Sequence, residues 1–444
     1  MQLKIFKFGG ALLNNIDGFQ QLNSIMKNEK QPTIIVISAF QKTTSLLLKA
    51  AKIAEICKDD ALKIIDEIFE YHYSITLKLI SNKVNQNKTK SFITKQKEQV
   101  SKIISGISIT KELTPRTKDL VLSFGEMLAS RIVSDFLAAT NSSITLFNIT
   151  EVLVTDSNYG AAVPNISETQ KRINEKLVPV IKSNNCIVTQ GFIAANAANE
   201  ITTMGYESSN LTATILAGLL DVTEFVIWSD TEGIRYFDPK FAKKNSPLVK
   251  AINYDFAEFL AFNGLKVIHP PMIDYLRQFN LSVEYRSGYE PKGNFTKIEK
   301  NAIEPINPFL IHSKEFSIFY NYDYKNRKNY INKLNYLVKS HNEGVYIFPN
   351  NSLFVTSKAS STVANELLAD GFTKIDGVQL LTLINVSYLG ISFELTKILN
   401  DYVNDVEILE IIIDNIRKTF KIFFKTENIN FVKDVFKNFE YIWM

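Results

Sequence analysis

The sequence predicts a mostly parallel α/β domain followed by smaller α+β units. Up to about residue 225, short apolar runs typical of buried strands alternate with longer amphipathic runs typical of helices. Such alternation favours a parallel sheet whose strands are connected by helices. After a Pro- and Asn-rich connector at residues 301–308, short strands dominate, and the pattern changes to α+β.

The overall composition is that of an ordinary globular protein. The chain has 444 residues, 45% hydrophobic and 22% charged, enough for roughly two to four domains. Its formal net charge is only +4 and its lysines are scattered, so we expect no nucleic-acid or anionic-membrane partner. No run approaches the roughly 18 apolar residues of a membrane span, and no apolar signal region follows Met1. We expect a cytoplasmic protein.

Cysteine and histidine give no indication of a metal site. Cys57 and Cys186 lie far apart in the sequence, and the four histidines are scattered. Both cysteines are expected to be buried thiols in a reducing compartment.

Residues 3–8 are predicted to form the first strand, which Gly9-Gly10 ends before a helix that begins near Asn15. Glycines at such a turn allow an anion to approach backbone N–H groups, and Lys7 would neutralise phosphate charge. The alternative is a tight turn beside a solvated lysine.

A second buried strand is predicted at 33–39, followed by a helix from Leu46 to about Cys57. Residues 60–113 have helical periodicity, and we predict a helical insertion there rather than a part of the sheet. His72, within it, is expected to be a packed helix histidine and not a ligand.

A long amphipathic helix is predicted from Asp119 to Leu137, with Gly125 and Glu126 in its otherwise apolar middle. Because glycine costs a helix about 1 kcal/mol relative to alanine, we expect another segment to approach closely at Gly125. Glu126 would then be a carboxylate held near the core. The alternative is a partly exposed glutamate.

Two more strand-like stretches follow, at 144–154 and at 186–193, with a polar turn at 155–160 between them. The stretch 201–240 then contains a polar loop (204–210), an apolar helix (211–220), a short strand (225–228) and a polar turn (229–233). Ligands of parallel sheets bind where strands end, so both loops are candidate ligand-binding segments. The alternative is a surface turn and a capped helix without a ligand.

A helix is predicted at 256–263, followed by a helix exit at 263–271 that ends in two prolines and carries Lys266. We predict a domain boundary near 300–308, which gives a first domain at 1–300 and a second region at 301–444.

The second region is predicted to contain two small ferredoxin-like α+β units. Its predicted helices lie at about 325–341 and 361–370, and its strand-rich segments at 309–320, 345–348, 353–356, 374–394, 407–414, 419–425 and 439–443.

Seven motifs occur in an order that resembles the aspartate kinases of the amino-acid kinase family. They are KFGG (7–10), SA…TT (38–44), GE (125–126), TD (155–156), QGF (190–192), W-S-D-x-x-G…DPK (228–240) and an H-P helix exit (266–270). The resemblance covers roughly residues 3–298. It implies a three-layer αβα sandwich followed by two ACT-like units, which in this family bind an end-product amino acid and form a homodimer.

The resemblance also implies a reaction: ATP, with Mg²⁺, phosphorylates the side-chain carboxylate of a free amino acid, L-aspartate. Such an acceptor is already a nucleophile at neutral pH, so the protein has only to position the reactants and neutralise charge. By the resemblance, Lys7 and the Gly9 and Gly10 amides hold the phosphates, and Lys266 is a second cation. The implied nucleotide pocket is lined by Ser229, Asp230, Gly233, Arg235, Tyr236, Asp238 and Lys240.

For the acceptor, the resemblance assigns Thr44 to the reacting carboxylate and Glu126 to the ammonium group, beside Ser209 in the substrate loop. The family loop G-R-x-G-S-D is Gly205-Tyr206-Glu207-Ser208-Ser209-Asn210 here. Tyr206 thus replaces the arginine that binds the α-carboxylate, and Asn210 replaces an aspartate. A phenol cannot make the charge-assisted hydrogen bonds of a guanidinium, worth about 1.5–3 kcal/mol each.

Leu12 is a further departure, because the family has a hydroxyl residue there. The residues that the resemblance assigns to the nucleotide therefore match the family pattern better than those assigned to the acceptor amino acid. Three functions are compatible with this pattern: a working aspartate kinase, an impaired nucleotide-binding paralogue that acts as a regulatory subunit, or an amino-acid kinase with another acceptor.

Overall fold

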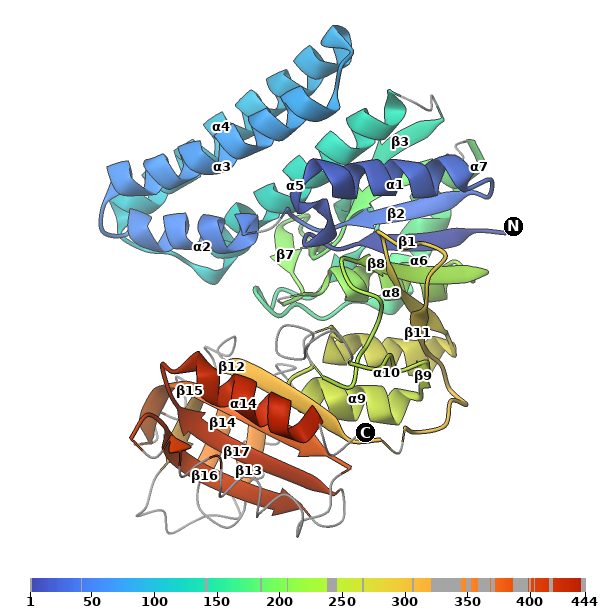
Figure 1. Cartoon of the computed structure of the whole chain (residues 1–444). Coiled ribbons are helices and arrows are strands. Elements are labelled where there is room, and N and C mark those ends of the chain that lie inside the picture. Colours follow the sequence, from blue (N-terminus) through green and yellow to red (C-terminus); the bar gives the residue numbers. More distant parts are fainter. Residues whose placement is uncertain are drawn as a thin grey trace. The chain divides into compact units, whose positions relative to one another are not determined.

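The computed structural model describes residues 2–320 apart from 41, 140–142, 184–185, 206, 238–245, 266 and 306. Beyond 320 it describes 345–348, 353–357, 368, 372–385, 398, 401–402, 404–414 and 418–440. The chain divides into two compact units, residues 1–233 with 272–300, and residues 234–271 with 301–444 (Figure 1). The boundary near 300–308 remains a prediction, and residues 234–271 group with the C-terminal residues.

Seven strands of the first unit form one sheet in the order β3-β5-β2-β1-β8-β10-β11. Their bounds are Ile144–Phe147, Cys186–Gln190, Thr33–Ile37, Lys4–Phe8, Glu224–Ser229, Val283–Ser287 and Phe295–Ile298 in that order. Every neighbouring pair is parallel except β10 and β11. The predicted, mostly parallel sheet is confirmed. Strands β2 and β5 are buried along their whole length, so both faces of the sheet are covered.

The predicted strand at 144–154 is wrong in its middle. After β3, a 3-10 turn at Ile149–Glu151 interrupts the predicted strand. The Asn148 side chain caps this turn by accepting a hydrogen bond from Thr150 N. The chain then joins a second, small sheet of β4 (Val154–Thr155), β6 (Ile193–Asn196) and β7 (Ile201–Thr203).

The helices of the first unit form the outer layers. Their bounds are α1 Ile16–Asn28, α2 Thr43–Ala54, α5 Pro115–Ala138, α6 Ile166–Arg172, α7 Val178–Ser183, α8 Ser209–Leu219 and α10 Pro270–Phe279.

Two contacts assign helices to faces. Gln190 Nε2 donates to Ser130 Oγ on α5 at 2.9 Å, and the Tyr285 hydroxyl donates to Met272 Sδ on α10 at 3.5 Å. Across the sheet, Gln190 is in register with Phe8, and Tyr285 is in register with the preceding residue of β1, Lys7. Since successive residues of a strand point to opposite faces, α5 and α10 cover opposite sides of the sheet.

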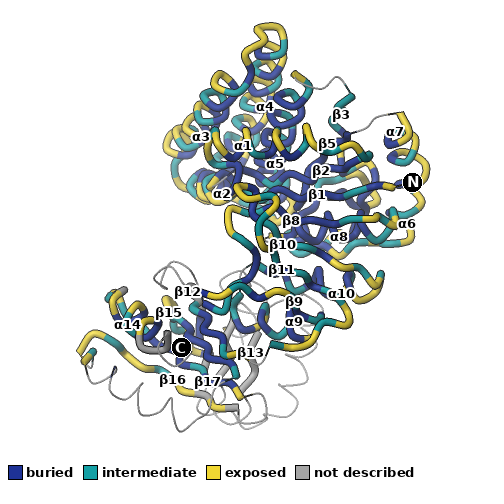
Figure 2. Tube along the Cα trace, turned by 45° about the vertical axis from the view of Figure 1, so that its right-hand side comes forward, coloured by how far each residue is buried: buried dark blue, intermediate teal, exposed yellow. Residues whose placement is uncertain are grey.

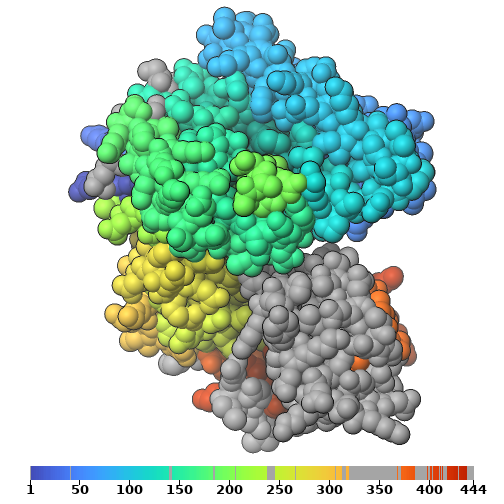
Figure 3. All heavy atoms as spheres, turned by 180° about the vertical axis from the view of Figure 1, so that it is seen from behind, coloured from blue at the N-terminus to red at the C-terminus, as the bar shows by residue number. Residues whose placement is uncertain are grey.

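The predicted helical insertion is confirmed as a hairpin of α3 (Lys58–Leu79) and α4 (Lys83–Thr110). Its outward residues are exposed (Figure 2), and it forms the blue edge of the space-filling view (Figure 3). His72 is a packed helix residue, as predicted: its ring stacks on Phe40 at 5.4 Å, and Nδ1 lies 2.7 Å from Ile68 O. Burial lowers the pKa of His72 to about 4, so the ring is neutral.

The two prolines at 270–271 begin a helix, α10, and do not end a helix exit. Proline is favoured at the first helical position, where its missing N–H would have no intrahelical partner. The preceding helix is α9 (Tyr254–Phe262), as predicted, and the Asn253 side chain caps it by accepting from Phe256 N at 2.8 Å. The short strand β9 (Ala251–Ile252) precedes it.

The second unit contains one antiparallel six-stranded sheet in the order β13-β14-β12-β15-β17-β16. The bounds in that order are Val345–Phe348, Leu353–Ser357, Phe309–Tyr320, Thr373–Ile384, Thr419–Lys425 and Glu407–Asp414. The strands expected in two small units thus pair in a single sheet. The predicted helices at 325–341 and 361–370 lie outside the described residues, apart from Leu368.

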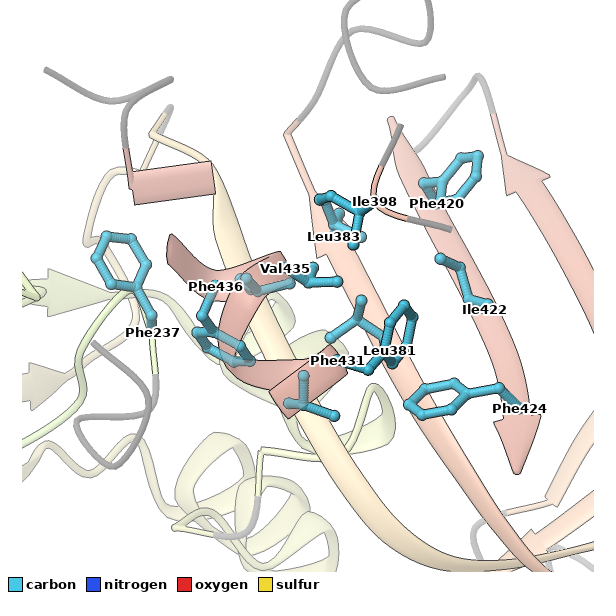
Figure 4. Packing of buried hydrophobic residues seen from close by; sticks show 12 residues of the cluster. Phe237, Leu381, Leu383, Ile398, Phe420, Ile422, Phe424, Phe431, Val435 and Phe436 are labelled. Atoms are coloured by element: carbon cyan, nitrogen blue, oxygen red, sulfur yellow. The ribbon is translucent and has the colours of Figure 1, made fainter. Parts of the chain in front are cut away.

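One face of this sheet is covered by α14 (Ile429–Glu440), as Figure 4 shows. Leu381 and Leu383 of β15 and Phe424 of β17 pack against Phe431 and Val435 of the helix. The expected C-terminal strand is therefore wrong at its start, because Phe439 belongs to α14 and residues 441–444 lie outside the described part. Among the described residues, no helix is long and apolar enough to cross a lipid bilayer.

Candidate active site

Four parallel strands of the first unit end in register at one edge of the sheet. Gln190, Ile37, Phe8 and Trp228 pair across β5, β2, β1 and β8. The loops begin immediately after the first three residues, and one residue after Trp228 in β8. Because ligands of open α/β sheets bind outside the carboxyl ends of the strands, this edge is the candidate site.

Lys7 is the cation of this edge. It lies on β1 and is only 9% exposed, and no hydrogen bond or ion pair to its side chain occurs in the described chain. Burial lowers the pKa of its ammonium group to about 8, and the Glu207 carboxylate, which favours the charged form, offsets part of this shift. A buried cation without a hydrogen-bonding partner is costly, which favours an anionic ligand at this position.

The two glycines after β1 differ in what they offer such a ligand. Gly9 N donates to Trp228 O at 3.1 Å, so this amide extends the sheet and is not available to a phosphate. Gly10 N has no partner among the described residues. Only one of the two amides expected to hold phosphate is therefore free within that part of the chain.

The turn after β8 carries the described part of the predicted nucleotide pocket. Ser229 Oγ donates to Asp230 Oδ1 at 3.1 Å; Ser229 is half-buried and Asp230 is exposed. Gly233 has φ = +77°, and a Cβ there would lie 2.6 Å from Thr296 Oγ1. The turn therefore requires glycine.

Glu126 is buried, which excludes the alternative of a partly exposed glutamate. Its Oε1 accepts from Ala39 N at 3.3 Å, and Oε2 has no partner among the described residues. Burial raises the pKa of Glu126 to about 8, against the hydrogen bond from Ala39, which favours the charged form. A Cβ at Gly125 would lie 3.0 Å from Ala39 Cβ, so the close approach expected at this glycine is confirmed.

Thr44 lies in the first turn of α2, which begins after β2 and three residues earlier than predicted. The residue is half-buried. The helix has no side-chain cap, since Lys42 occupies the cap position with φ = +67°.

Ser209 and Asn210 form the first turn of α8, and both are buried. Ser209 packs on the QGF segment: a Cβ on Gly191 would lie 2.5 Å from Ser209 Cβ and 2.8 Å from its Cα. Gly191 N in turn donates to Ile37 O at 2.9 Å, so the start of α8 is held at the end of β2.

Gly191→Ala is therefore expected to destabilise the protein by about 1–3 kcal/mol, because α8 must move to admit the methyl group. Gly106→Ala is the matched control: this glycine lies inside α4 with nothing within 4 Å of the position that a Cβ would take, and the change is expected to stabilise by about 0.5–1 kcal/mol. Denaturation midpoints measure both. Equal effects of the two substitutions would contradict the close approach.

Leu12 packs against the loop that follows β10. It is fully buried, and a Cβ on Gly288 would lie 2.4 Å from its Cδ2. This departure from the family pattern is thus a packing contact between the loops that follow β1 and β10.

The remaining predicted residues fall in the second unit or outside the described chain. Arg235 Nη1 donates to Ser246 O, and the Tyr236 ring lies 4.6 Å from that of Phe309. Tyr206, Asp238, Lys240 and Lys266 lie outside the described residues. Their roles in binding remain predictions.

Sequence reasoning missed two carboxylates. Glu207 interacts electrostatically with both Lys7 and Tyr285, from a loop position with φ = +64°. Asp119 is buried on α5 and accepts from Gly160 N, Thr203 N and Thr203 Oγ1 at 2.8–2.9 Å. An acidic residue near a helix start is too common to be singled out, and Glu207 is brought to Lys7 only by the fold.

Within the described chain, no group of three His, Cys, Asp or Glu side chains could hold a metal ion. Mg²⁺ in phosphoryl-transfer sites needs no such cage, because substrate phosphates and water supply most of its ligands.

Comparisons with known proteins identify the family of this chain. The amino acid kinase family matches residues 2–284. The chain is 30% identical over 312 residues to the bifunctional aspartokinase/homoserine dehydrogenase of Buchnera aphidicola, covering 68% of this chain and 37% of that protein. It is 28% identical to the chloroplast aspartokinase 1 of Arabidopsis thaliana, covering 67% and 52%. The chain thus spans about half or less of the length of these relatives.

Among solved structures, E. coli aspartokinase III in complex with aspartate and ADP has a TM-score of 0.78 over 98% of both chains, at 19% identity. The protein is therefore a three-layer α/β protein with the predicted fold, and its C-terminal sheet is consistent with ACT-like units. It belongs to the amino acid kinase family.

Proposed function

We propose that this chain is an aspartate kinase that transfers the γ-phosphoryl group of ATP to the side-chain carboxylate of L-aspartate. The observation that carries the proposal is the buried ammonium of Lys7, unpaired in the described chain, beside the free Gly10 amide at the carboxyl end of β1. The names of the relatives support the choice of acceptor, since both include an aspartokinase.

The reaction needs no general base. A side-chain carboxylate oxygen of aspartate forms a bond to the γ-phosphorus, the bond from that phosphorus to the β,γ-bridging oxygen breaks, and ADP leaves with the electron pair. The products are 4-phospho-L-aspartate and ADP, and no proton is transferred. The residues therefore act by positioning and by charge neutralisation.

In this proposal Lys7 and the Gly10 amide bind phosphate oxygens, and the turn Ser229–Gly233 borders the nucleotide. Arg235, Tyr236, Asp238 and Lys240 would complete the nucleotide pocket, and Lys266 would be the second cation. Mg²⁺ would enter with ATP, and the exposed carboxylate of Asp230 is suited to orient its water ligands.

In the acceptor half, Glu126 Oε2 and Asn210 Oδ1 are buried acceptors without partners in the described chain, which suits an ammonium group. Thr44 would contact the reacting carboxylate. Tyr206 and Asn210, in place of arginine and aspartate, favour a second candidate: a family member that is impaired with aspartate, or one that phosphorylates another amino acid.

A coupled assay of ADP release with L-aspartate and Mg-ATP tests the proposal, and we expect a rate clearly above the aspartate-free background. The double variant Tyr206→Arg, Asn210→Asp decides between the candidates. A working enzyme should gain less than about threefold in kcat/KM, whereas a gain of 100-fold or more would favour the impaired paralogue. Turnover of another amino acid without turnover of aspartate would identify a different acceptor.

For the C-terminal region we propose two ACT-like units that bind an amino-acid effector and form a homodimer. The antiparallel sheet with α14 on one face supports this. The cytoplasmic location likewise remains a proposal.

A further inference from the structure

The start of α8 contains two buried polar atoms that the fold leaves unpaired. Ser208, at the N-cap, is fully buried, and its Oγ has no hydrogen-bond partner in the described chain. Asn210 is 7% exposed, and its Oδ1 is equally unpaired there. A buried hydroxyl without a partner is destabilising, so such groups are rare unless a ligand or water completes them.

The backbone at the same place offers further donors. Ser208 makes no side-chain cap to the eleven-residue helix. The N–H groups of Ser209 and Leu211 have no partner in the part of the chain that the structure describes. A helix start with free N–H groups favours an anion, and a buried hydroxyl beside them adds one more donor.

This donor set lies at the same sheet edge as an acceptor set. Ser209 packs on Gly191, whose N–H binds Ile37 O at the end of β2. Ala39, two residues after Ile37, donates its N–H to Glu126 Oε1. The other carboxyl oxygen of Glu126, Oε2, is unpaired in the described residues. Donors for a carboxylate and acceptors for an ammonium group thus flank the end of one strand, as the two ends of a zwitterion require.

We propose that Ser208 Oγ and the N–H groups of Ser209 and Leu211 bind the α-carboxylate of the acceptor amino acid, in place of a guanidinium. This specificity role for Ser208 rests on the proposed function. It explains how Tyr206 can stand where a substrate-binding arginine is expected. The α-carboxylate is held by neutral donors at a helix start, and Ser208 discriminates acceptors that carry this charge from acceptors that lack it.

The test compares L-aspartate with its α-amide, L-isoasparagine, which keeps the amine and the reacting carboxylate. In Ser208→Ala we expect kcat/KM for L-aspartate to fall roughly tenfold to 100-fold. The value for the α-amide should change less than about threefold, and KM for ATP should stay constant. The matched control is Ser123→Ala on α5, a fully buried serine whose Oγ donates to Leu120 O at 2.7 Å. It should not change the preference for aspartate.

A rescue separates binding from folding: Tyr206→Arg added to Ser208→Ala should restore the preference for aspartate. Equal losses with both acceptors would overturn the proposal, because they indicate a structural role for Ser208. A rise in KM for ATP alone would also overturn it and place a phosphate at this helix start. If the wild-type protein shows no aspartate-dependent ADP release, the proposed function fails, and the inference falls with it.

Discussion

Lys7→Met is expected to abolish phosphoryl transfer and, at pH 7, to make the protein more stable. The ammonium group of Lys7 is buried and has no hydrogen-bonding partner in the described chain, so its charge costs folding free energy in the absence of ligand. Its loss removes the cation assigned to the phosphates, and we expect kcat/KM to fall by about 10³-fold or more.

The pH dependence of stability follows from the lowered pKa of Lys7. The unfolded chain keeps this proton up to the ordinary value of 10.5, whereas the folded chain loses it near pH 8. Below pH 8 both states are protonated and the full cost, about 3 kcal/mol, is present. Between pH 8 and 10.5 the unfolded state binds more protons, so the wild type gains stability as the pH rises.

Denaturation midpoints from about pH 6 to 10.5 measure this difference, and Lys7→Met should exceed the wild type at pH 7 and lose its advantage near pH 10. Lys4→Met is the control from the same strand. Lys4 pairs with Glu29 at 3.0 Å and Glu224 at 2.8 Å, so its loss should cost up to about 1 kcal/mol and leave activity near that of the wild type. An active Lys7→Met enzyme would remove the site assignment.

Glu126→Gln is expected to weaken acceptor binding strongly while the fold remains intact. The amide oxygen of glutamine can still accept from Ala39 N, but glutamine cannot give up a proton to become the anion that pairs with a bound ammonium group. Hydrogen bonds to charged groups contribute about 1.5–3 kcal/mol, so KM for L-aspartate should rise roughly tenfold to 100-fold, with KM for ATP unchanged.

The stability of this variant relative to the wild type should rise with pH, whereas that of Lys7→Met relative to the wild type should fall with pH. The pKa of Glu126 is raised from 4.5 to about 8, so between these values the folded state holds a proton that the unfolded state has lost. The wild type therefore loses stability as the pH rises from 4.5 to 8, and Glu126→Gln does not. Glu151→Gln, at an exposed position, is the control. A Glu126→Gln enzyme with an unchanged KM for aspartate would show that Glu126 is not an acceptor-binding residue.

The main sheet and its ligand-binding edge were predictable because the spacing of apolar residues along the sequence reveals where buried strands begin and end. Runs such as 33–37 and 186–190 are apolar on both faces, as only strands covered on both sides are. Errors occurred where one residue type has two structural uses. Prolines at 270–271 were expected only as the end of a helix exit, although proline also favours the first turn of a new helix. Phe439 was assigned to a strand, although Phe431, Val432, Val435 and Phe436 already have helical spacing.

The candidate site was predictable in its residues but not in their hydrogen bonding. Lys7 and Glu126 were named from motifs, yet only the fold shows that both are buried and lack full sets of partners in the described chain. Ser208 could not be singled out, because a serine before a helix normally indicates a cap, and the absence of the capping bond is a property of three-dimensional placement. Leu12, in contrast, turned out to be a packing residue.

Trp228 gives this edge an optical property of its own. The centroid of its ring lies 6.1 Å from that of Phe8, on which it stacks. Trp228 pairs with Phe8 across β8 and β1 at the edge where the candidate site lies. Its indole N–H has no partner among the described residues. The chain has only one other tryptophan, Trp443. With Trp443→Phe, tryptophan emission would come from a single residue next to Gly9, so that ligand occupancy can be followed in real time without labels or coupling enzymes.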